Sequence, residues 1–208
     1  EYIHVEKPDQ EAVPSRQFDI SKIDFELLSR EFAHTRRKNL LLRDLDELVN
    51  QQLSKMLFAN PQRIDYYDRY QEIIDAYNAE QNRATIEKTF MDLMELASSL
   101  DTEQQRYVRE GFSSDEELSV YDLLFSENLT KQEIETIKKV SVDLLTKIKQ
   151  QIAKLDHWTD KQETKAIVDN LIRNTLWQEL PNSYDVSDIQ TYQKKIYEYV
   201  YMRYPEVA

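Results

Sequence analysis

Residues 60–78 read NPQRIDYYDRYQEIIDAYN, and they predict a central helix that neighbouring segments cover. Asn60 can accept hydrogen bonds from the first free amides of this helix, and Pro61 stands where a missing amide costs nothing. One face of the helix carries Ile64, Tyr67, Gln71, Ile74 and Asn78, and the adjoining face carries Tyr66, Tyr70, Ile73 and Tyr77. Because both faces are rich in apolar and aromatic side chains, we expect other helices to pack on both.

The composition of the whole chain predicts an all-α fold, a multi-helix bundle. The 208 residues include one glycine and five prolines, and 40% of them are hydrophobic. A β-rich fold needs turn glycines that this chain lacks. The abundance of Leu, Ile, Glu, Lys and Gln favours helix instead.

The segments around residues 60–78 divide the chain into three expected parts. Residues 1–22 have no sustained period and are expected to be a linker. Residues 23–125 form a front helical bundle, with one helix from Asp24 and a longer one over residues 42–57. Residues 126–208 form a back bundle of three helices. The segment Phe125–Asn128 is the expected boundary between the two bundles.

Local chemistry marks where the later helices begin and end. Thr85 is a candidate cap for one helix, and Asp101 is expected to open a short helix that stops at Gly111 in a left-handed cap. Capping-box spacing, Ser or Thr followed three residues later by Glu or Gln, occurs four times: Ser114–Glu117, Thr130–Glu133, Thr159–Gln162 and Ser187–Gln190.

Several classes of function are excluded by composition. A P-loop needs at least two glycines, and thiolate chemistry needs cysteines, of which there are none. No apolar run is long enough for a membrane span, and the absence of cysteine fits a reducing compartment, so we expect a cytoplasmic protein with no membrane contact. Residues 1–4 and 31–34 spell Glu-x-x-His, but residues 1–4 lie in the expected linker and cannot face a helix across a bundle core. We therefore expect no metal, no cofactor and no catalytic residue.

A basic run, Arg36, Arg37 and Lys38, is the first candidate functional feature. The formal net charge of −12 argues against nucleic-acid binding by the whole surface, because phosphates repel such a field. A loop that presents three cations could still contact the phosphates of duplex DNA without reading sequence. The same cations could equally pair with the acidic side chains that outnumber them.

Aromatic residues near the end of the chain are the second candidate feature. Five tyrosines circle the last expected helix, at positions 192, 197, 199, 201 and 204, so some must leave the core. Exposed aromatic side chains are typical of protein contact surfaces. Tyr192 and Tyr199, together with Trp158, are the candidate partner-binding residues. The alternative is a small bundle in which several tyrosines are only half covered.

Particular segments resemble a known family. They are Phe25–Leu28, Phe32, Lys38–Asn39, Leu53–Tyr67 (with the specific step Met-Leu…Asn-Pro-x-Arg), Tyr70–Ile74, Tyr77–Asn78, Leu118–Leu124 and Trp158–Glu163 (with Trp-Thr-x-Lys). Over about residues 18–180, and more loosely over the rest, the chain is similar to the C-terminal helical region of the restriction (motor, R) subunit of type I restriction enzymes. These bacterial complexes are ATP-dependent site-specific deoxyribonucleases that translocate DNA. The resemblance implies that nuclease and motor domains lie upstream, and that this region docks them onto the modification (methyltransferase) subunit. No catalytic motif of the family has a matching position here.

Three hypotheses of function follow. The first is a non-catalytic assembly domain of such a subunit, and the second is a DNA-backbone contact module of the same subunit. The third is a free-standing helical protein, either an interaction domain or a metal-dependent or hydrolytic enzyme.

Overall fold

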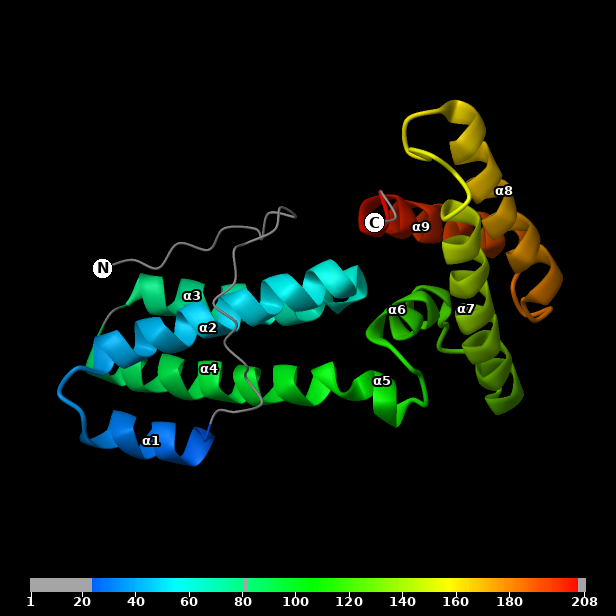
Figure 1. Ribbon diagram of the computed structural model, residues 1–208. Coiled ribbons are helices and arrows are strands. Elements are labelled where there is room, and N and C mark those ends of the chain that lie inside the picture. Colours follow the sequence, from blue (N-terminus) through cyan, green and yellow to red (C-terminus); the bar gives the residue numbers. More distant parts are fainter. Residues whose placement is uncertain (1–23, 81, 206–208) are drawn as a thin grey trace. The chain divides into compact units, whose positions relative to one another are not determined.

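The computed structural model describes residues 24–80 and 82–205, and in these ranges every regular element is helical (Figure 1). The elements are α1 (Phe25–His34), α2 (Lys38–Ala59), the 3-10 turn η2 (Pro61–Arg63), α3 (Ile64–Ala79), α4 (Arg83–Gln104), α5 (Arg106–Arg109), α6 (Asp115–Leu124), α7 (Lys131–Ile152), α8 (Gln162–Glu179) and α9 (Val186–Arg203). The all-α fold is therefore confirmed. None of the described helices combines the length and the apolar character that crossing a bilayer requires.

The chain divides into two compact units, residues 1–106 (unit 1) and residues 107–208 (unit 2). This division comes earlier than the expected boundary at Phe125–Asn128. The reason is the packing of α6, which contacts α7 and α9 and buries Leu118, Val120 and Leu124 in the core of unit 2. Among the described residues of unit 2, the ten-residue α6 therefore packs with α7, α8 and α9, where a bundle of three helices was expected. The expected linker over residues 1–22 lies outside the described residues.

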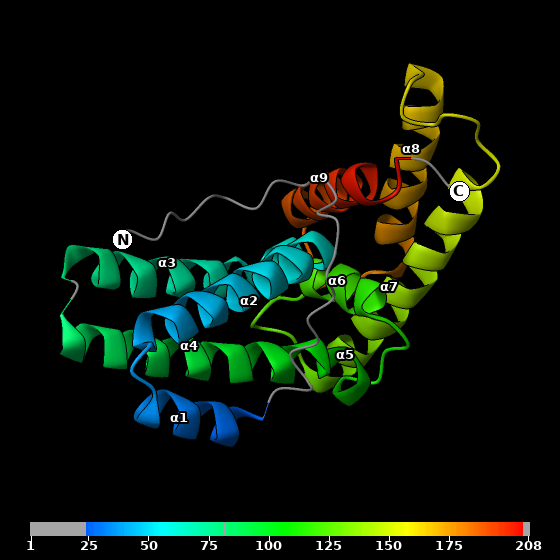
Figure 2. The ribbon, with the colours of Figure 1, turned by 60° about the vertical axis from the view of Figure 1, so that its left-hand side comes forward.

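Unit 1 is organised around α4, which packs along both α2 and α3. α1 lies beside α4 (Figure 2) and adds to the same core. The ring of Phe32 in α1 stacks on that of Phe90 in α4, with the ring centroids 3.7 Å apart. The core also takes apolar side chains from one face of each longer helix, including Leu42, Val49, Leu53, Ile74, Leu93, Leu96 and Leu100.

Residues 60–78 form η2 and α3, and the expected start is confirmed. The side-chain oxygen of Asn60 accepts a hydrogen bond from the Gln62 amide at 3.1 Å, and Pro61 opens the turn. On α3, the face with Tyr70, Ile73 and Tyr77 is buried. The face with Ile64, Tyr67 and Ile74 is covered only in part, since Tyr67 and Ile74 are buried and Ile64 is 45% exposed. One broad face is therefore covered, rather than two complete ones, because α4 is the main helix that packs on α3.

Unit 2 is a ring of four helices in which α6 packs on α7, α7 on α8, α8 on α9, and α9 on α6. Its core is continuous through all four, with residues such as Ile137, Leu144, Ile148, Val168, Ile172, Leu176, Ile196 and Val200 almost fully buried. The apolar residues of α7 recur at helical spacing, which explains why this two-sided helix can contact both α6 and α8.

Two of the expected helix starts in unit 2 are confirmed. Thr130 caps α7 in a complete capping box with Glu133. Ser114 caps α6 by accepting the Glu117 amide, although the Glu117 carboxylate accepts the amide of Ser113 instead of closing the box. Gly111 has a φ of 84°, the left-handed conformation that was expected.

The remaining starts differ from the prediction. α9 is capped by Asp185 in a box with Asp188, two residues before the expected Ser187. α4 is capped by Asn82, whose side chain accepts the amide of Thr85, so Thr85 is not the cap. Asn and Asp are as good as or better than Ser and Thr as caps, which favours these earlier residues. α8 begins at Gln162 without a side-chain cap, so Thr159 does not start it. Asp101 lies inside α4, which continues to Gln104.

Candidate functional site

The first candidate surface lies at the end of unit 1 where α2 and α4 begin side by side (Figure 1). Lys38, the first residue of α2, reaches across to α4, where its Nζ lies 2.6 Å from a carboxylate oxygen of Glu87. Nε of Arg83 lies 3.2 Å from the same oxygen. These two cations hold the pKa of Glu87 below its ordinary value, because their hydrogen bonds favour the charged carboxylate. The Lys38–Glu87 ion pair therefore joins the start of α2 to the first turns of α4, whereas the Arg83–Glu87 pair lies within α4.

The three basic residues predicted as DNA contacts are placed differently from one another. Lys38 is largely taken up by unit 1: its side chain is 19% exposed, and its ammonium lies 4.8 Å from the ring centroid of Phe32. Arg36 and Arg37 are exposed. Within residues 24–80 and 82–205, neither forms an ion pair with a carboxylate. The fold also brings Arg83 to this end, a cation that the local sequence pattern could not reveal because it lies more than 40 residues away in the chain.

The second candidate surface begins with Trp158, which is 1% exposed. Its indole Nε1 donates a hydrogen bond to the carbonyl oxygen of Tyr204 at 2.6 Å. The rings of Tyr197 and Tyr201 pack edge-on against it, at centroid distances of 6.2 and 5.7 Å. Trp158 is therefore a core residue and offers no surface to a partner, which corrects its assignment as a contact residue. Its role in unit 2 is to support the two tyrosines.

The two tyrosines predicted to bind a partner also pack inside unit 2. Tyr199 is 3% exposed, and its ring packs at a right angle to that of Tyr204. Tyr192 is half-buried and packs on Tyr184, whose hydroxyl donates to the carbonyl oxygen of Leu124 at 2.7 Å. Burial raises the pKa of both Tyr192 and Tyr199. Tyr192 and Tyr199 share the face of α9 that packs on the core. Tyr199 is buried there, which corrects its assignment as a contact residue. Tyr192 lies at the partly covered edge of that face and is only half available to a partner.

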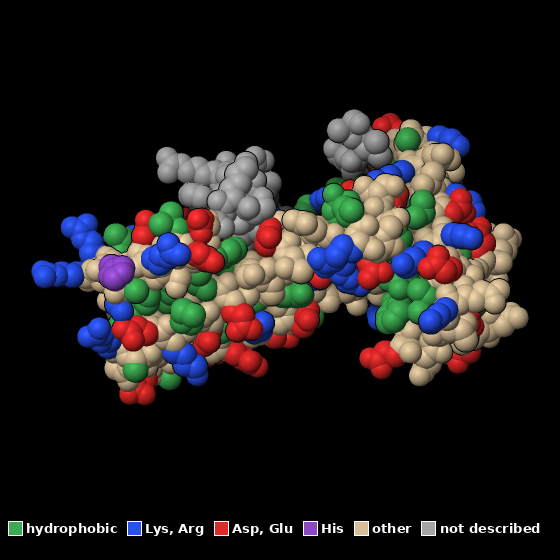
Figure 3. All heavy atoms as spheres, turned by 90° about the horizontal axis from the view of Figure 1, so that it is seen from below, with side chains coloured by type: hydrophobic (Ala, Val, Ile, Leu, Met, Phe, Trp, Pro, Cys, Tyr) green, Lys and Arg blue, Asp and Glu red, His purple; other side chains and the backbone are tan. Residues whose placement is uncertain are grey.

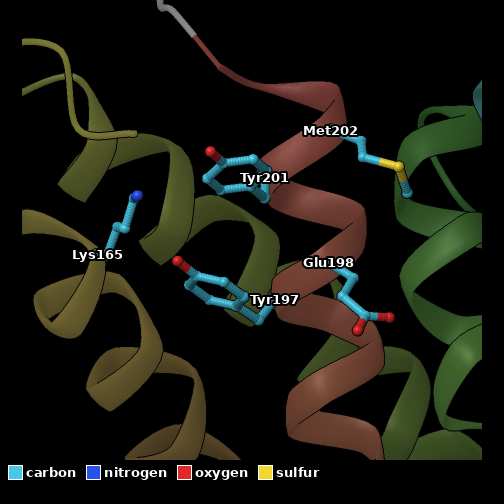
Figure 4. A pocket seen from close by; sticks show the side chains of 5 residues that line it. All are labelled: Lys165, Tyr197, Glu198, Tyr201 and Met202. Carbon is cyan, nitrogen blue, oxygen red and sulfur yellow. The ribbon is translucent and has the colours of Figure 1, made fainter. Parts of the chain in front are cut away.

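The tyrosine that does reach the surface is Tyr201. Its neighbourhood on α8 and α9, which we call the α8–α9 surface, consists of Lys165, Tyr197, Glu198, Tyr201 and Met202, and these residues line a pocket of about 440 Å³ (Figure 4). Tyr197 and Tyr201 point toward the side of Lys165, whose ammonium lies 5.7 Å from the Tyr201 ring centroid. Tyr201 is 39% exposed and Met202 44%. Aromatic, thioether and charged groups in one shallow site suit contact with another protein.

The described residues contain no group of three or more histidine and acidic side chains placed to hold a metal ion. Of the two Glu-x-x-His patterns, residues 31–34 end α1, and residues 1–4 lie outside the described part. Two buried ionisable pairs do occur, but they join helices of unit 1. One is Arg63 with Glu103, and the other is Asp46, which accepts a hydrogen bond from the Tyr70 hydroxyl at 2.7 Å. Burial raises the pKa of Asp46, although this hydrogen bond opposes the shift.

Comparison with known proteins identifies one family. The family described as "Type I restriction enzyme HindI endonuclease subunit-like, C-terminal" matches residues 11–204 of the chain. This match covers residues 18–180, over which the resemblance was noted, and also most of the rest of the chain, to which the resemblance extended more loosely. Searches of curated proteins and of solved structures gave no significant match.

Proposed function

Taking as the premise that this chain belongs to the family of type I restriction enzyme HindI endonuclease subunit-like C-terminal domains, we propose that it is a non-catalytic assembly domain. In this proposal it docks the motor and nuclease domains of its own subunit onto the modification (methyltransferase) subunit. The partner is a folded protein, and the contact is made by the α8–α9 surface.

The observation that carries this proposal is the exposure of two consecutive residues at the end of α9, Tyr201 and Met202, beside the pocket that they help to line. Tyrosine and methionine are enriched at protein interfaces, where a rigid, amphipathic side chain loses little conformational entropy on binding. Tyr201 is held from beneath by Trp158, which is itself fixed by its hydrogen bond to Tyr204. Preorganised aromatic side chains of this kind are typical binding hot spots.

Charged side chains flank the apolar part of the α8–α9 surface. Lys165 and Glu198 lie on opposite sides of the tyrosine pair, so the surface presents one cation and one anion (Figure 4). A partner with complementary charges around an apolar centre would be oriented by them. This arrangement supports a specific protein contact more than a general apolar association.

The test is binding of the chain to the purified methyltransferase core, measured by co-elution and by titration calorimetry. We expect the double variant Tyr201→Ala with Met202→Ala to bind at least about tenfold more weakly, because truncating two hot-spot side chains costs more than about 1.4 kcal/mol. The matched control is Ile64→Ala with Met91→Ala, which removes two side chains of unit 1 that are 45% and 56% exposed. The control is expected to bind like the unsubstituted chain.

Two results would reject the proposal. One is the absence of any complex between the unsubstituted chain and the methyltransferase core. The other is equal weakening by the α9 variant and the control. Far-UV circular dichroism checks that both variants keep their helices, which is expected because all four side chains are exposed.

A further inference from the structure

We infer that the chain has a second binding site, for the phosphates of a duplex nucleic acid backbone, formed by Arg36, Arg37 and Arg83. We call these three residues the arginine tip. They lie at the end of unit 1 where α2 and α4 begin, and Figure 3 shows Lys and Arg side chains projecting from that end of the unit. The inference goes beyond docking and does not depend on the α8–α9 surface.

The balance of charge makes the arginine tip unusual in this chain. Acidic residues outnumber Lys and Arg by 39 to 27, so a surface cation usually has a carboxylate within reach. Lys38 and Arg83 share one carboxylate, that of Glu87, and two cations therefore face a single negative charge. Arg36 and Arg37 add two further cations with no carboxylate partner among the described residues. Glu80, at the end of α3, places a second carboxylate at this end of the unit. The four cations still outnumber these two acids, so the local charge is positive on an otherwise acidic chain.

The position of these cations is unfavourable for the helices that carry them. Arg36 and Arg37 precede the N-terminus of α2, and Arg83 is the first residue of α4. A helix N-terminus carries partial positive charge and is stabilised by acidic side chains. α1, α3, α6, α7, α8 and α9 each have an acidic residue in the first turn, whereas α2, α4 and the four-residue α5 have none. A bound anion would remove this repulsion.

The chemistry of the tip suits phosphate better than other anions. The guanidinium group presents a planar fork of donors that binds two phosphate oxygens at once. Two adjacent arginines before α2 and a third at the first position of α4 can reach separate phosphates, and the Lys38–Glu87 ion pair holds the starts of α2 and α4 together. Contacts of this kind position a duplex without reading its sequence. The family is that of an endonuclease subunit, and duplex DNA is therefore the nucleic acid to test.

The experiment measures fluorescence anisotropy of a labelled DNA duplex titrated with the 208-residue chain in about 50 mM and about 200 mM salt. The tip variant is Arg36→Glu with Arg37→Glu. The matched control is Lys194→Glu with Lys195→Glu, an adjacent pair of exposed cations on α9 that changes the net charge equally. We expect the tip variant to bind the duplex at least about fivefold more weakly at low salt. We also expect the slope of log K against log salt to be about 1.8 units shallower for this variant, because it makes two fewer phosphate contacts. The affinity of the control variant for the duplex is expected to stay within about twofold of that of the unsubstituted chain, because Lys194 and Lys195 make none of the proposed phosphate contacts.

Three results would overturn the inference. The unsubstituted chain could fail to bind duplex at low salt, the two variants could weaken binding equally, or a labelled polyglutamate chain could bind as tightly as the duplex. The last result would assign the tip to an acidic protein segment. Binding of the tip variant to the methyltransferase core is measured in parallel and is expected to be unchanged, so that failure here is separate from failure of the docking proposal.

Discussion

Neutralising one buried carboxylate in unit 1 tests how the turn after α2 is held to the end of α4. Nε of Arg63, the last residue of η2, lies 3.0 Å from a carboxylate oxygen of Glu103, and a terminal nitrogen of Arg106 lies 3.2 Å from the same oxygen. The side chains of Arg63 and Glu103 are 4% and 11% exposed. The substitution Glu103→Gln keeps the size of the side chain and removes its charge.

We expect this substitution to lower the free energy of unfolding of unit 1 by about 2–3 kcal/mol. Removing one partner of a buried ion pair costs about 3–5 kcal/mol, because the remaining charge stays in a poorly solvated site. The amide oxygen of glutamine can still accept a hydrogen bond from Arg63, and we place the loss at or just below the lower end of that range. Water-exposed pairs behave differently and contribute about 0–1 kcal/mol.

The assay is urea denaturation followed by far-UV circular dichroism. Both tryptophans, Trp158 and Trp177, belong to unit 2, so tryptophan fluorescence would not report directly on unit 1. With a slope of about 2 kcal/mol per molar urea, the expected loss lowers the midpoint by about 1–1.5 M. The matched control is Glu26→Gln, which removes the charge of the pair Arg30–Glu26, whose side chains are 75% and 86% exposed.

The reasoning is refuted if Glu103→Gln shifts the urea midpoint no more than Glu26→Gln does. A second variant, Arg63→Met with Glu103→Met, separates the loss of charge balance from the loss of packing. Replacing both members of a buried pair by apolar side chains is often neutral or stabilising. The double variant should therefore be more stable than Glu103→Gln.

Three further predictions concern unit 2. Gly111→Ala should lower the free energy of unfolding by about 1 kcal/mol in urea titrations, because φ is +84° and the added methyl group meets no atom within 4 Å, which leaves backbone strain as the cost. Burial raises the pKa of Glu116, but its pairing with Lys149 and Arg203 outweighs this and holds the pKa below the ordinary value of 4.5. The charged Glu116 therefore stabilises the fold above pH 4.5, and this contribution is lost as the pH falls through the lowered pKa. We expect Glu116→Gln to lower the free energy of unfolding by about 1–2 kcal/mol at neutral pH and by progressively less in acid. Urea midpoints measured across this pH range test the prediction. Trp158→Phe keeps an aromatic ring but removes the donor to Tyr204, and we expect a loss of about 1–2 kcal/mol on thermal unfolding; an unchanged melting temperature would contradict the role of this bond.

For both candidate surfaces, the sequence predicted which residue types gather there but not which of them are exposed. The period of α9 showed that five tyrosines could not all face one side, and Tyr201 is indeed exposed. Which tyrosines reach the surface depended on where α6 and α8 pack against α9. That arrangement buried Tyr199 and placed Trp158 under Tyr201. The basic run at residues 36–38 was visible in the sequence, but its division into one paired lysine and two exposed arginines required the position of Glu87 on another helix.

Short-range patterns in the sequence were enough to predict the all-α class, the capped starts at Asn60 and Thr130, and the left-handed turn at Gly111. Each of these features depends on interactions within about four residues. The boundary between the units, the partners of Arg63 and Lys38, and the exposed face of α9 depend on contacts between residues about 40 or more positions apart. Helical period shows that a face is apolar, but many neighbours can cover an apolar face equally well. The choice among them is made by how the side chains of all the helices fill the core together.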